Sequence, residues 1–373
     1  MAKAVYVGVN SKARKMKKAY IGIGGKARKV KKMYIGVGGK ARLCYSAELE
    51  RYGMAAALST ARYDMRAATV GKYALFAGGL APNPFFGENA SSSVDAYNTS
   101  LTKSTPTELS CKRCGHAAAS VGGYALFAGG ASSYNFLGYG NILSSVDAYD
   151  ASLTRSAAHI IGATVAIGGA AVGNYALFAG GTVYSQINED NVTSDVLAYD
   201  PSLTFTTAPL LSVARANVKG ASAGNYALFA GGRAGSFCTT VDAYNASLTR
   251  TTATALSSTK NNSAAATVGN HAIFVGNTAS ADIYDASLTK TSAAILSTAR
   301  TGLAATTVGD YAIFSGGGVA DFCDASLTRS SIGTSMTGYD MGAATIGDYA
   351  LFAGGYSDEK SVTIYDSVEV YTA

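Results

Sequence analysis

Short runs of apolar residues alternate with polar residues and glycines along most of the chain. The clearest run is Tyr-Ala-Leu-Phe-Ala followed by a glycine pair, and no long stretch spaces its apolar residues as an amphipathic helix does. Five-residue runs that are rich in tyrosine, valine and threonine and bounded by glycine are typical of short strands joined by tight turns. The pattern therefore predicts an all-β protein.

The apolar run belongs to a phrase, Gly-x-Tyr-Ala-Leu-Phe-Ala-Gly-Gly, that recurs along the chain. Five close copies and two variants begin at Gly71, Gly122, Gly173, Gly224, Gly269, Gly309 and Gly347. The seven copies are spaced 51, 51, 51, 45, 40 and 38 residues apart. A repeat of this size indicates an architecture in which each repeat is one supersecondary unit.

Each unit holds three further segments at regular distances from this phrase. An alanine-rich run precedes it, as at 264–268, and a Val-Asp-Ala-Tyr phrase follows it, as at 94–97. In six units a Ser-Leu-Thr sequence, as at 100–102, then leads into a polar run. Each unit thus predicts four antiparallel strands, named a to d in chain order. One four-stranded sheet cannot bury both faces, so we expect the units to stack radially as a seven-bladed β-propeller.

The two ends of the repeat array are complementary. The last unit ends at strand c, within 368–373, and lacks a strand d. The first unit is preceded by residues 47–58, where Leu58 lies thirteen residues before Gly71, as Leu211 does before Gly224. We expect residues 47–58 to supply strand d of blade 7 and to close the ring, which removes the exposed edges of an open array.

The repeats resemble kelch repeats over roughly residues 46–373. Glycine pairs such as Gly78-Gly79, the tyrosine of strand c and the Arg-x-x-His at 113–116 stand where kelch repeats carry theirs. Tryptophan is absent from the chain, and Gly276-Asn277 replaces one glycine pair. The resemblance implies a seven-bladed kelch-type propeller whose blades pack through Leu, Phe and Tyr. It also implies structural hydrogen bonding by the strand c acids, which are Asp95, Asp147, Asp242 and Asp282.

Residues 1–45 carry a different repeat, with a period of 14 residues. Its copies at 6–14, 20–28 and 34–42 alternate apolar residues with glycine before a Lys-Ala-Arg sequence, which predicts small hairpins. The segment holds 13 of the 30 Lys and Arg residues and none of the 24 acidic residues. The remainder has 17 basic and 24 acidic residues, a net charge of −7, so the two parts are expected to have different roles.

This basic segment resembles the short repeats at the start of tail and tail-fibre proteins of phages and prophages of Gram-positive bacteria. The resemblance implies attachment to other tail or baseplate proteins, or to further copies of the chain. The attachment residues would be Tyr6, Tyr20, Tyr34, Arg14, Arg28 and Arg42. Two alternatives stay open: cations with interleaved tyrosines can bind nucleic acid, or the segment is a solvated basic tail.

The connections between strands b and c are candidate ligand-binding loops. In an antiparallel blade they share one face with the d–a connections, and they are longest in blades 1–3. They carry six aromatic residues: Phe85, Phe86, Tyr134, Phe136, Tyr139 and Tyr184. Long loops on a rigid scaffold commonly bind ligands, and aromatic rings stack on sugars. The alternative is that these rings pack on one another.

A basic residue recurs nine positions before the repeat glycine, near the start of strand a. The five copies are Arg62, Arg113, Arg215, Lys260 and Arg300. A ring of cations near the channel would attract an anionic ligand. The alternative is that these cations make structural hydrogen bonds, as the equivalent arginine of kelch repeats does.

No catalytic or metal-binding constellation is recognisable. Cys111 and Cys114 form a lone Cys-x-x-Cys without the further ligands that zinc needs, and there are only three histidines. We therefore expect no cofactor, no metal and no enzymatic activity. Five cysteines and the absence of a long apolar segment predict no disulfide framework, no signal peptide and no membrane insertion.

Together these features favour a phage or prophage tail-associated adhesin, found in the virion or, before assembly, in the host cytoplasm. The propeller would bind a bacterial surface glycan or another envelope receptor, and the basic segment would project from the opposite face. Two alternatives remain: a cytoplasmic kelch module that binds a protein or nucleic acid, and a glycan-cleaving propeller enzyme.

Overall fold

The computed structural model divides the chain into two compact units, Met1–Glu50 with Thr372–Ala373 and Arg51–Tyr371. The structure describes residues 6–9, 12–15, 19–23, 26–30, 32–37, 40–46, 48–83, 87–135, 138–159, 162, 164–183, 191–260, 264–357 and 363–373. Strands are the only regular elements in these ranges. No helix in the described part of the chain is long and apolar enough to cross a membrane.

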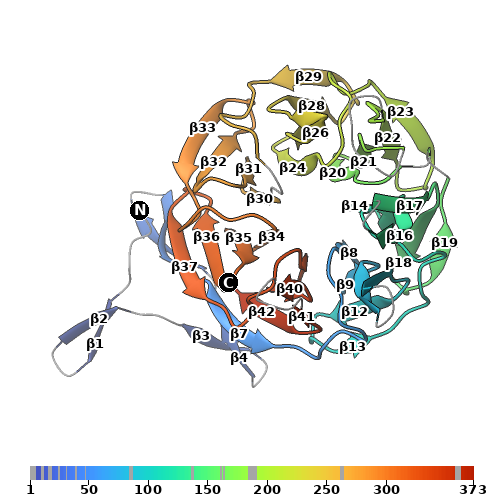
Figure 1. Cartoon of the computed structure of the whole chain (residues 1–373). Helices are drawn as coiled ribbons and strands as arrows, with labels where there is room; N and C mark the ends of the chain where they lie inside the picture. Colours follow the sequence, from blue (N-terminus) through green and yellow to red (C-terminus); the bar gives the residue numbers. More distant parts are fainter. Residues whose placement is uncertain are drawn as a thin grey trace. The chain divides into compact units, whose positions relative to one another are not determined.

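Seven four-stranded antiparallel sheets surround a central channel, so the seven-bladed propeller predicted from the repeats is confirmed (Figure 1). The alanine-rich strands a line the channel: β8 (Arg66–Val70), β14 (Ala117–Val121), β20 (Gly168–Val172), β24 (Lys219–Ala223), β30 (Ala264–Val268), β34 (Ala304–Val308) and β38 (Gly342–Ile346). The strands b carry the Tyr-Ala-Leu-Phe-Ala run: β9 (Tyr73–Ala77), β15 (Tyr124–Ala128), β21 (Tyr175–Ala179), β25 (Tyr226–Ala230), β31 (His271–Val275), β35 (Tyr311–Gly316) and β39 (Tyr349–Ala353).

The outer half of each blade consists of strands c and d. The strands c are β12 (Val94–Asn98), β18 (Val146–Asp150), β22 (Val196–Tyr199), β28 (Val241–Asn245), β32 (Ser280–Tyr284), β36 (Val319–Asp324) and β42 (Val368–Thr372). The strands d are β13 (Lys103–Ser104), β19 (Arg155–Ala157), β23 (Phe205–Ala208), β29 (Arg250–Ala253), β33 (Lys290–Ala294), β37 (Arg329–Gly333) and, in blade 7, β7 (Glu50–Met54). The small side chains of strands a suit the crowded position beside the channel, and the larger side chains of strands b and c fill the space between blades.

Strand β7 closes the ring as predicted. It lies beside β42 in the last sheet, whose order is β38-β39-β42-β7. The pairing continues beyond the strand, because the Ala55 and Leu58 amides donate to the carbonyls of Val368 and Asp366 at 2.9 and 2.8 Å. Leu58 is buried in a core that joins residues of blade 7 to residues of blade 1. The structure therefore narrows the expected strand from 47–58 to Glu50–Met54 and keeps Leu58 as its apolar anchor.

Aromatic pairs fill the space between blades in place of tryptophan. Phe76 of strand b and Tyr97 of strand c meet edge to face at a centroid distance of 5.8 Å. Both rings are fully buried, and equivalent pairs occur in blades 2, 3, 4, 5 and 7, as between Phe229 and Tyr244 at 5.9 Å, whereas blade 6 has Cys323 in place of the tyrosine. Such pairs are favourable beyond the area that they bury.

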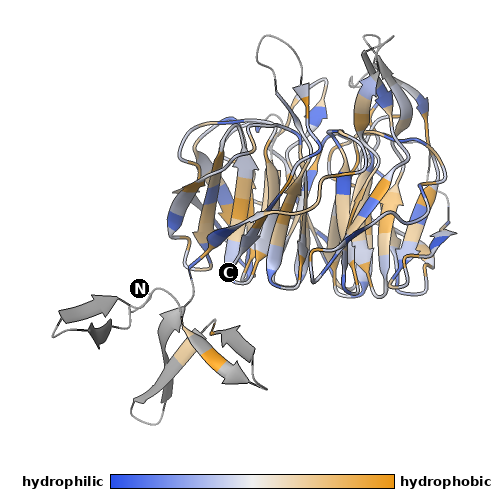
Figure 2. Ribbon diagram, turned by 90° about the horizontal axis from the view of Figure 1, so that it is seen from below, coloured by the Kyte–Doolittle hydropathy of each residue, from blue (hydrophilic) through white to orange (hydrophobic). Residues whose placement is uncertain are grey.

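Within the described ranges, four blades carry a short hairpin between strands b and c. The hairpins are β10 (Leu80–Asn83) with β11 (Gly87–Ala90), β16 (Ala131–Asn135) with β17 (Gly138–Ile142), β26 (Arg233–Ala234) with β27 (Ser236–Phe237), and β40 (Tyr356–Ser357) with β41 (Thr363–Ile364). Figure 2 shows hairpins rising from one face of the propeller. These connections were expected to be loops, and their antiparallel pairing makes them extensions of the blades.

The N-terminal unit contains three hairpins, one for each copy of the 14-residue repeat. They are β1 (Tyr6–Val9) with β2 (Lys12–Lys15), β3 (Tyr20–Ile23) with β4 (Lys26–Lys29), and β5 (Lys32–Val37) with β6 (Lys40–Ser46). Each has a two-residue connection, because Val9 pairs with Lys12, Ile23 with Lys26 and Val37 with Lys40. This register is the one that the Asn-Ser and Gly-Gly pairs predict.

Candidate ligand-binding face

The b–c hairpins and the d–a connections lie on the same face of the propeller. Antiparallel bridges join them, as between Tyr63 and Leu80, Cys114 and Ala131, and Tyr339 and Tyr356. Leu80, Cys114 and Ala131 are buried in a small core beneath the hairpins of blades 1 and 2. This face, called the hairpin face below, is therefore a set of projections on a rigid base, with the channel mouth at its centre.

The predicted aromatic loop residues lie partly beyond the described ranges. Phe85, Phe86, Phe136 and Tyr184 are outside them. Tyr134 and Tyr139 are cross-strand partners in the β16–β17 hairpin of blade 2. Of the six predicted aromatic residues, the structure therefore places the backbone of Tyr134 and Tyr139 on the hairpin face, and the other four lie outside the described residues.

The five cations near strand a are buried against the strand c carboxylates. Arg62, Arg113 and Arg215 are fully buried and contact Asp95, Asp147 and Asp242 at 2.8, 2.7 and 2.9 Å. Lys260 lies 3.4 Å from Asp282, and Arg300 pairs with Asp321. With their charges matched and almost no exposed surface, these side chains offer nothing to an anion in solution. The geometry supports the structural alternative, in which they tie strand a to strand c.

Each of these carboxylates also meets a second cation from strand d. Asp147 contacts Arg155 at 2.9 Å, and Asp242 contacts Arg250 at the same distance. A serine amide completes the arrangement, as Ser110 donates to Asp147 at 3.1 Å. In blade 7 the carboxylate is Glu369, and its cation is Arg51 of the closing strand β7. Buried carboxylates require such complete pairing, because an unpaired buried charge is strongly destabilising.

A cluster of tyrosines marks the seam between blades 7 and 1 on the hairpin face. The Tyr63 and Tyr356 rings lie 4.8 Å apart, and the Tyr339 and Tyr356 rings lie 6.4 Å apart. All three side chains are half-buried, and Tyr365 beside them meets Thr337 at 3.2 Å. Sequence reasoning missed this cluster. Its signal was present, because among the seven units only blades 1 and 7 have a tyrosine eight residues before the repeat glycine.

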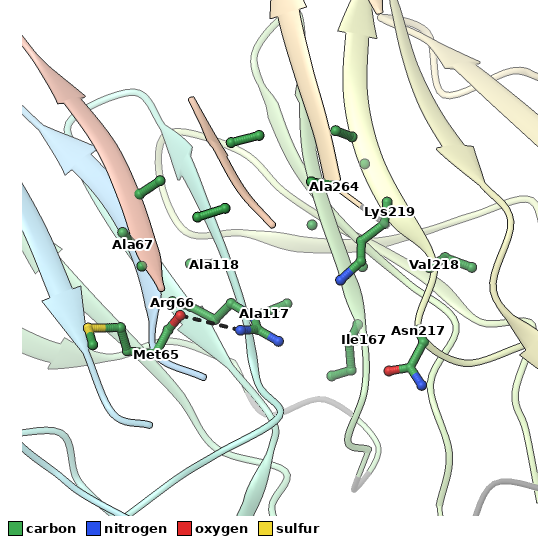
Figure 3. Close-up of a pocket in the computed structure, with 18 of the residues that line it drawn as sticks. Met65, Arg66, Ala67, Ala117, Ala118, Ile167, Asn217, Val218, Lys219 and Ala264 are labelled. Atoms are coloured by element: carbon green, nitrogen blue, oxygen red, sulfur yellow. Dashed lines mark hydrogen bonds between the residues drawn. The ribbon is translucent and has the colours of Figure 1, made fainter. Parts of the chain in front are cut away.

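The channel mouth on the same face is a cavity of about 320 Å³ (Figure 3). Alanine and glycine residues of the seven strands a form most of its wall, together with Met65 and Met341. Arg66, Asn217 and Lys219 are its polar lining residues. The continuing cavity toward the opposite face, of about 390 Å³, is lined by alanine, glycine, serine and threonine. Among the described lining residues, the charges of the channel are therefore concentrated at the hairpin face.

The charged groups at this mouth shift one another's ionisation. Burial lowers the pKa of Lys219, and the nearby Arg66 charge lowers it further against the opposing effects of Asp340 and Asp64. Burial raises the pKa of Asp340, and so does the Asp64 carboxylate. Asp64 itself contacts Arg66 at 2.8 Å and accepts the Gly115 amide at 2.9 Å. Because burial and Arg66 disfavour the protonated form of Lys219, an anion bound beside it would stabilise that form.

The attachment residues occupy equivalent places in the three N-terminal hairpins. Tyr6, Tyr20 and Tyr34 lie in β1, β3 and β5. Arg14, Arg28 and Arg42 lie opposite Val7, Ile21 and Ile35 in the three registers. The side chain of Ile21 is 53% exposed.

Cys111 and Cys114 are not joined in a disulfide; Cys111 is half-buried, and Cys114 is buried with its thiol donating to the Ala131 carbonyl at 3.4 Å. Among the residues that the structure describes, no group of three or more potential metal ligands comes together. No protein-family model and no curated protein matches the chain. The function must therefore be argued from the site itself.

Proposed function

We propose that the protein is a tail-associated receptor-binding module of a phage or prophage, whose hairpin face binds a bacterial surface glycan. The observation that carries this proposal is the cluster of Tyr63, Tyr339 and Tyr356 beside the channel mouth, on the face that bears the hairpins. Half-buried tyrosines present an apolar ring together with a hydroxyl group, which suits the mixed surface of a sugar. Antiparallel bridges from Tyr63 to Leu80 and from Tyr339 to Tyr356 fix the backbone of the cluster, so little conformational entropy is lost on binding.

The proposal assigns attachment to the basic segment, through tail proteins or further copies of this chain. The chain enters β7 at the face opposite the hairpins, because β7 runs antiparallel to β42 and β42 begins at the hairpin face. The proposal gives attachment to the basic segment and receptor binding to the hairpin face. Linking several such modules would raise the avidity for a repetitive cell-wall polymer without new contacts. The kelch-like repeats supply the scaffold in this proposal.

The test measures binding of the labelled full-length protein to intact Gram-positive cells and to their purified wall glycans. We expect binding without release of sugars, and we expect Tyr356→Ala and Tyr63→Ala each to weaken it about tenfold, equivalent to about 1.4 kcal/mol. Tyr52→Ala is the matched control, because Tyr52 is 56% exposed on β7, away from the hairpin face.

The proposal fails if no envelope preparation binds the protein or if the three variants bind alike. Release of sugar would instead identify a glycan-cleaving enzyme. Binding to nucleic acid that falls steeply with salt and depends on residues 1–45 would favour the nucleic-acid alternative.

A further inference from the structure

We propose that Arg66 and Lys219 make the channel mouth a binding site for one acidic group of a small ligand, a phosphate ester or a carboxylate. The site is distinct from the tyrosine cluster, and the inference does not depend on glycan binding by the hairpin face. Figure 3 shows both cationic side chains extending into one cavity from opposite walls.

The first support is that this cationic pair departs from the repeat. Arg66 and Lys219 are the first residues of β8 and β24, each five positions before its repeat glycine. The other blades have Ala117, Gly168, Ala264, Ala304 and Gly342 at this position. The fold thus needs only a small residue here. Two long cations at a crowded position cost conformational entropy and desolvation, which a purely structural role does not explain.

The second support is the distribution of charge around the cavity. The described lining residues include both cations and no acidic residue. Asp64 and Asp340, the carboxylates that influence Lys219, lie outside this lining. Within the described ranges, the Lys219 ammonium group has no hydrogen bond or ion pair. Arg66 already pairs with the Asp64 carboxylate at 2.8 Å, so the Lys219 ammonium group is the cation that an entering acidic group would meet without a carboxylate on it.

The third support is the geometry of the wall. Nη1 of Arg66 contacts the Asp64 carboxylate at 2.8 Å and donates to the carbonyls of Asp64 and Met65 at 3.3 Å, which fixes the guanidinium group against the channel wall. Asn217 adds an exposed amide from a backbone held at a positive φ of 57°. A preorganised arginine, a lysine and an amide are the donors that phosphate and carboxylate groups require. The 320 Å³ volume admits a monosaccharide-sized group rather than a folded chain.

The test is calorimetric titration of the full-length protein with inorganic phosphate and with glucuronate, at constant ionic strength, with glucose as the neutral probe. We expect both anions to bind and glucose not to bind in the channel. Lys219→Ala and Arg66→Ala should each weaken binding by at least about tenfold, as expected for the loss of a charge-assisted hydrogen bond. Both variants should fold, because alanine occupies the same position in blades 2, 5 and 6.

A pH series with glucuronate above about pH 7 isolates the lysine, since the ligand carboxylate stays ionised there. The groups that face Lys219 are Arg66, Asp64 and Asp340, and their combined effect with burial lowers the pKa of Lys219. Affinity should therefore decline at a lower pH than an ordinary lysine would impose, and Lys219→Arg should abolish that decline.

Arg233→Ala is the charge-matched control, because Arg233 is exposed on the β26–β27 hairpin of the same face. It should leave the affinity unchanged. Three results would overturn the proposal: neither anion binds at tens of millimolar, both channel variants bind as the native protein does, or the control weakens binding equally. Binding of phosphate and glucuronate alike would identify the site as general for acidic groups. Binding of only one would assign the site to that chemistry.

Discussion

Six of the seven blades have a buried carboxylate on strand c that pairs with cations. Blade 3 lacks it, and the residues that replace the charged groups there show what the carboxylate requires. In blade 3 that position is Leu197, the strand a cation is replaced by Thr164, and the strand d cation is replaced by Phe205. The Phe205 ring stacks on His159 at 4.5 Å. All three members of the charged set have thus been exchanged together for uncharged ones. A complete buried ion pair and a set of uncharged residues can both fill this position stably. A single buried charge without its partner is strongly destabilising.

This comparison predicts the effect of mutating blade 4 toward blade 3. Asp242→Leu should destabilise the protein by about 3–5 kcal/mol, because it leaves the buried Arg215 without its carboxylate. The triple variant Arg215→Thr, Asp242→Leu, Arg250→Phe should lose less stability than the single variant. Denaturant unfolding gives both free energies. If the triple variant were as unstable as Asp242→Leu, the uncharged residues of blade 3 could not replace the charged residues of blade 4, and this interpretation would be wrong.

Glu369 predicts how stability responds to acid at the closing seam. Burial tends to raise the pKa of Glu369, but hydrogen bonds from Thr334, Tyr371, Ser335 and Arg51 outweigh it and hold the pKa below the usual 4.5. The ionised form is therefore favoured by folding. Its contribution is complete above about pH 4.5 and is lost as the pH falls through the lowered folded-state pKa.

The matched variant is Glu369→Gln, which keeps the shape and removes the titration. We expect it to be less stable than the native protein at neutral pH, with a smaller decline of unfolding free energy on acidification. The two stabilities should converge at low pH. Parallel stability curves from about pH 7 to about pH 3 would contradict the assignment.

At the scale of elements, the strands were predictable and several connections were not. The recurring Tyr-Ala-Leu-Phe-Ala and Val-Asp-Ala-Tyr runs have the period of strands, and the orphan Leu58 spacing gave the closing strand. The repeated Ser-Leu-Thr sequence was recognised between strands c and d, but the hydrogen bonds and backbone conformation that form this turn were not predicted. Leu101 has a positive φ of 60°, and the Asn98 side chain accepts the Ser100 and Thr102 amides at 2.9 and 3.0 Å. The leucine keeps this costly conformation because it packs on the core between blades 7 and 1.

The site was less predictable because its geometry joins residues distant in sequence. The cation at Arg62 was found by its spacing, but its burial depends on Asp95, which is 33 residues away. The Tyr63–Tyr356 contact spans nearly the whole propeller and exists only because the ring closes. Arg66 and Lys219 carry no motif, and they stand out only when the seven blades are aligned by position.

At the scale of the whole molecule, successive blades are joined by bonds that run around the channel. A residue with positive φ precedes strand a in each described copy, and in blades 1, 3, 4 and 7 its amide donates to a backbone carbonyl of the preceding blade. The Ala166 amide donates to the Gly115 carbonyl at 2.7 Å, and the Asp64 amide donates to the Asp340 carbonyl at 2.9 Å across the closing seam. The ring therefore carries the same inter-blade bond at the closure as elsewhere. We therefore expect the stability of the whole propeller, and not only that of blade 7, to depend on the closing strand β7.

Two truncations test that dependence. Removing residues 1–45 deletes the basic hairpins but leaves β7, so the melting temperature of the propeller should stay close to that of the full chain. Removing residues 1–58 also deletes the fourth strand of blade 7, the Arg51 partner of Glu369 and the buried Leu58. The melting temperature should then fall by on the order of 10 °C, because several kcal/mol of packing and pairing are lost. Leu58→Ala within the 46–373 chain should give an intermediate loss, since it keeps the strand and removes its anchor. Equal melting temperatures for the two truncations would mean that blade 7 is stable with three strands and that the ring does not need its N-terminal closure.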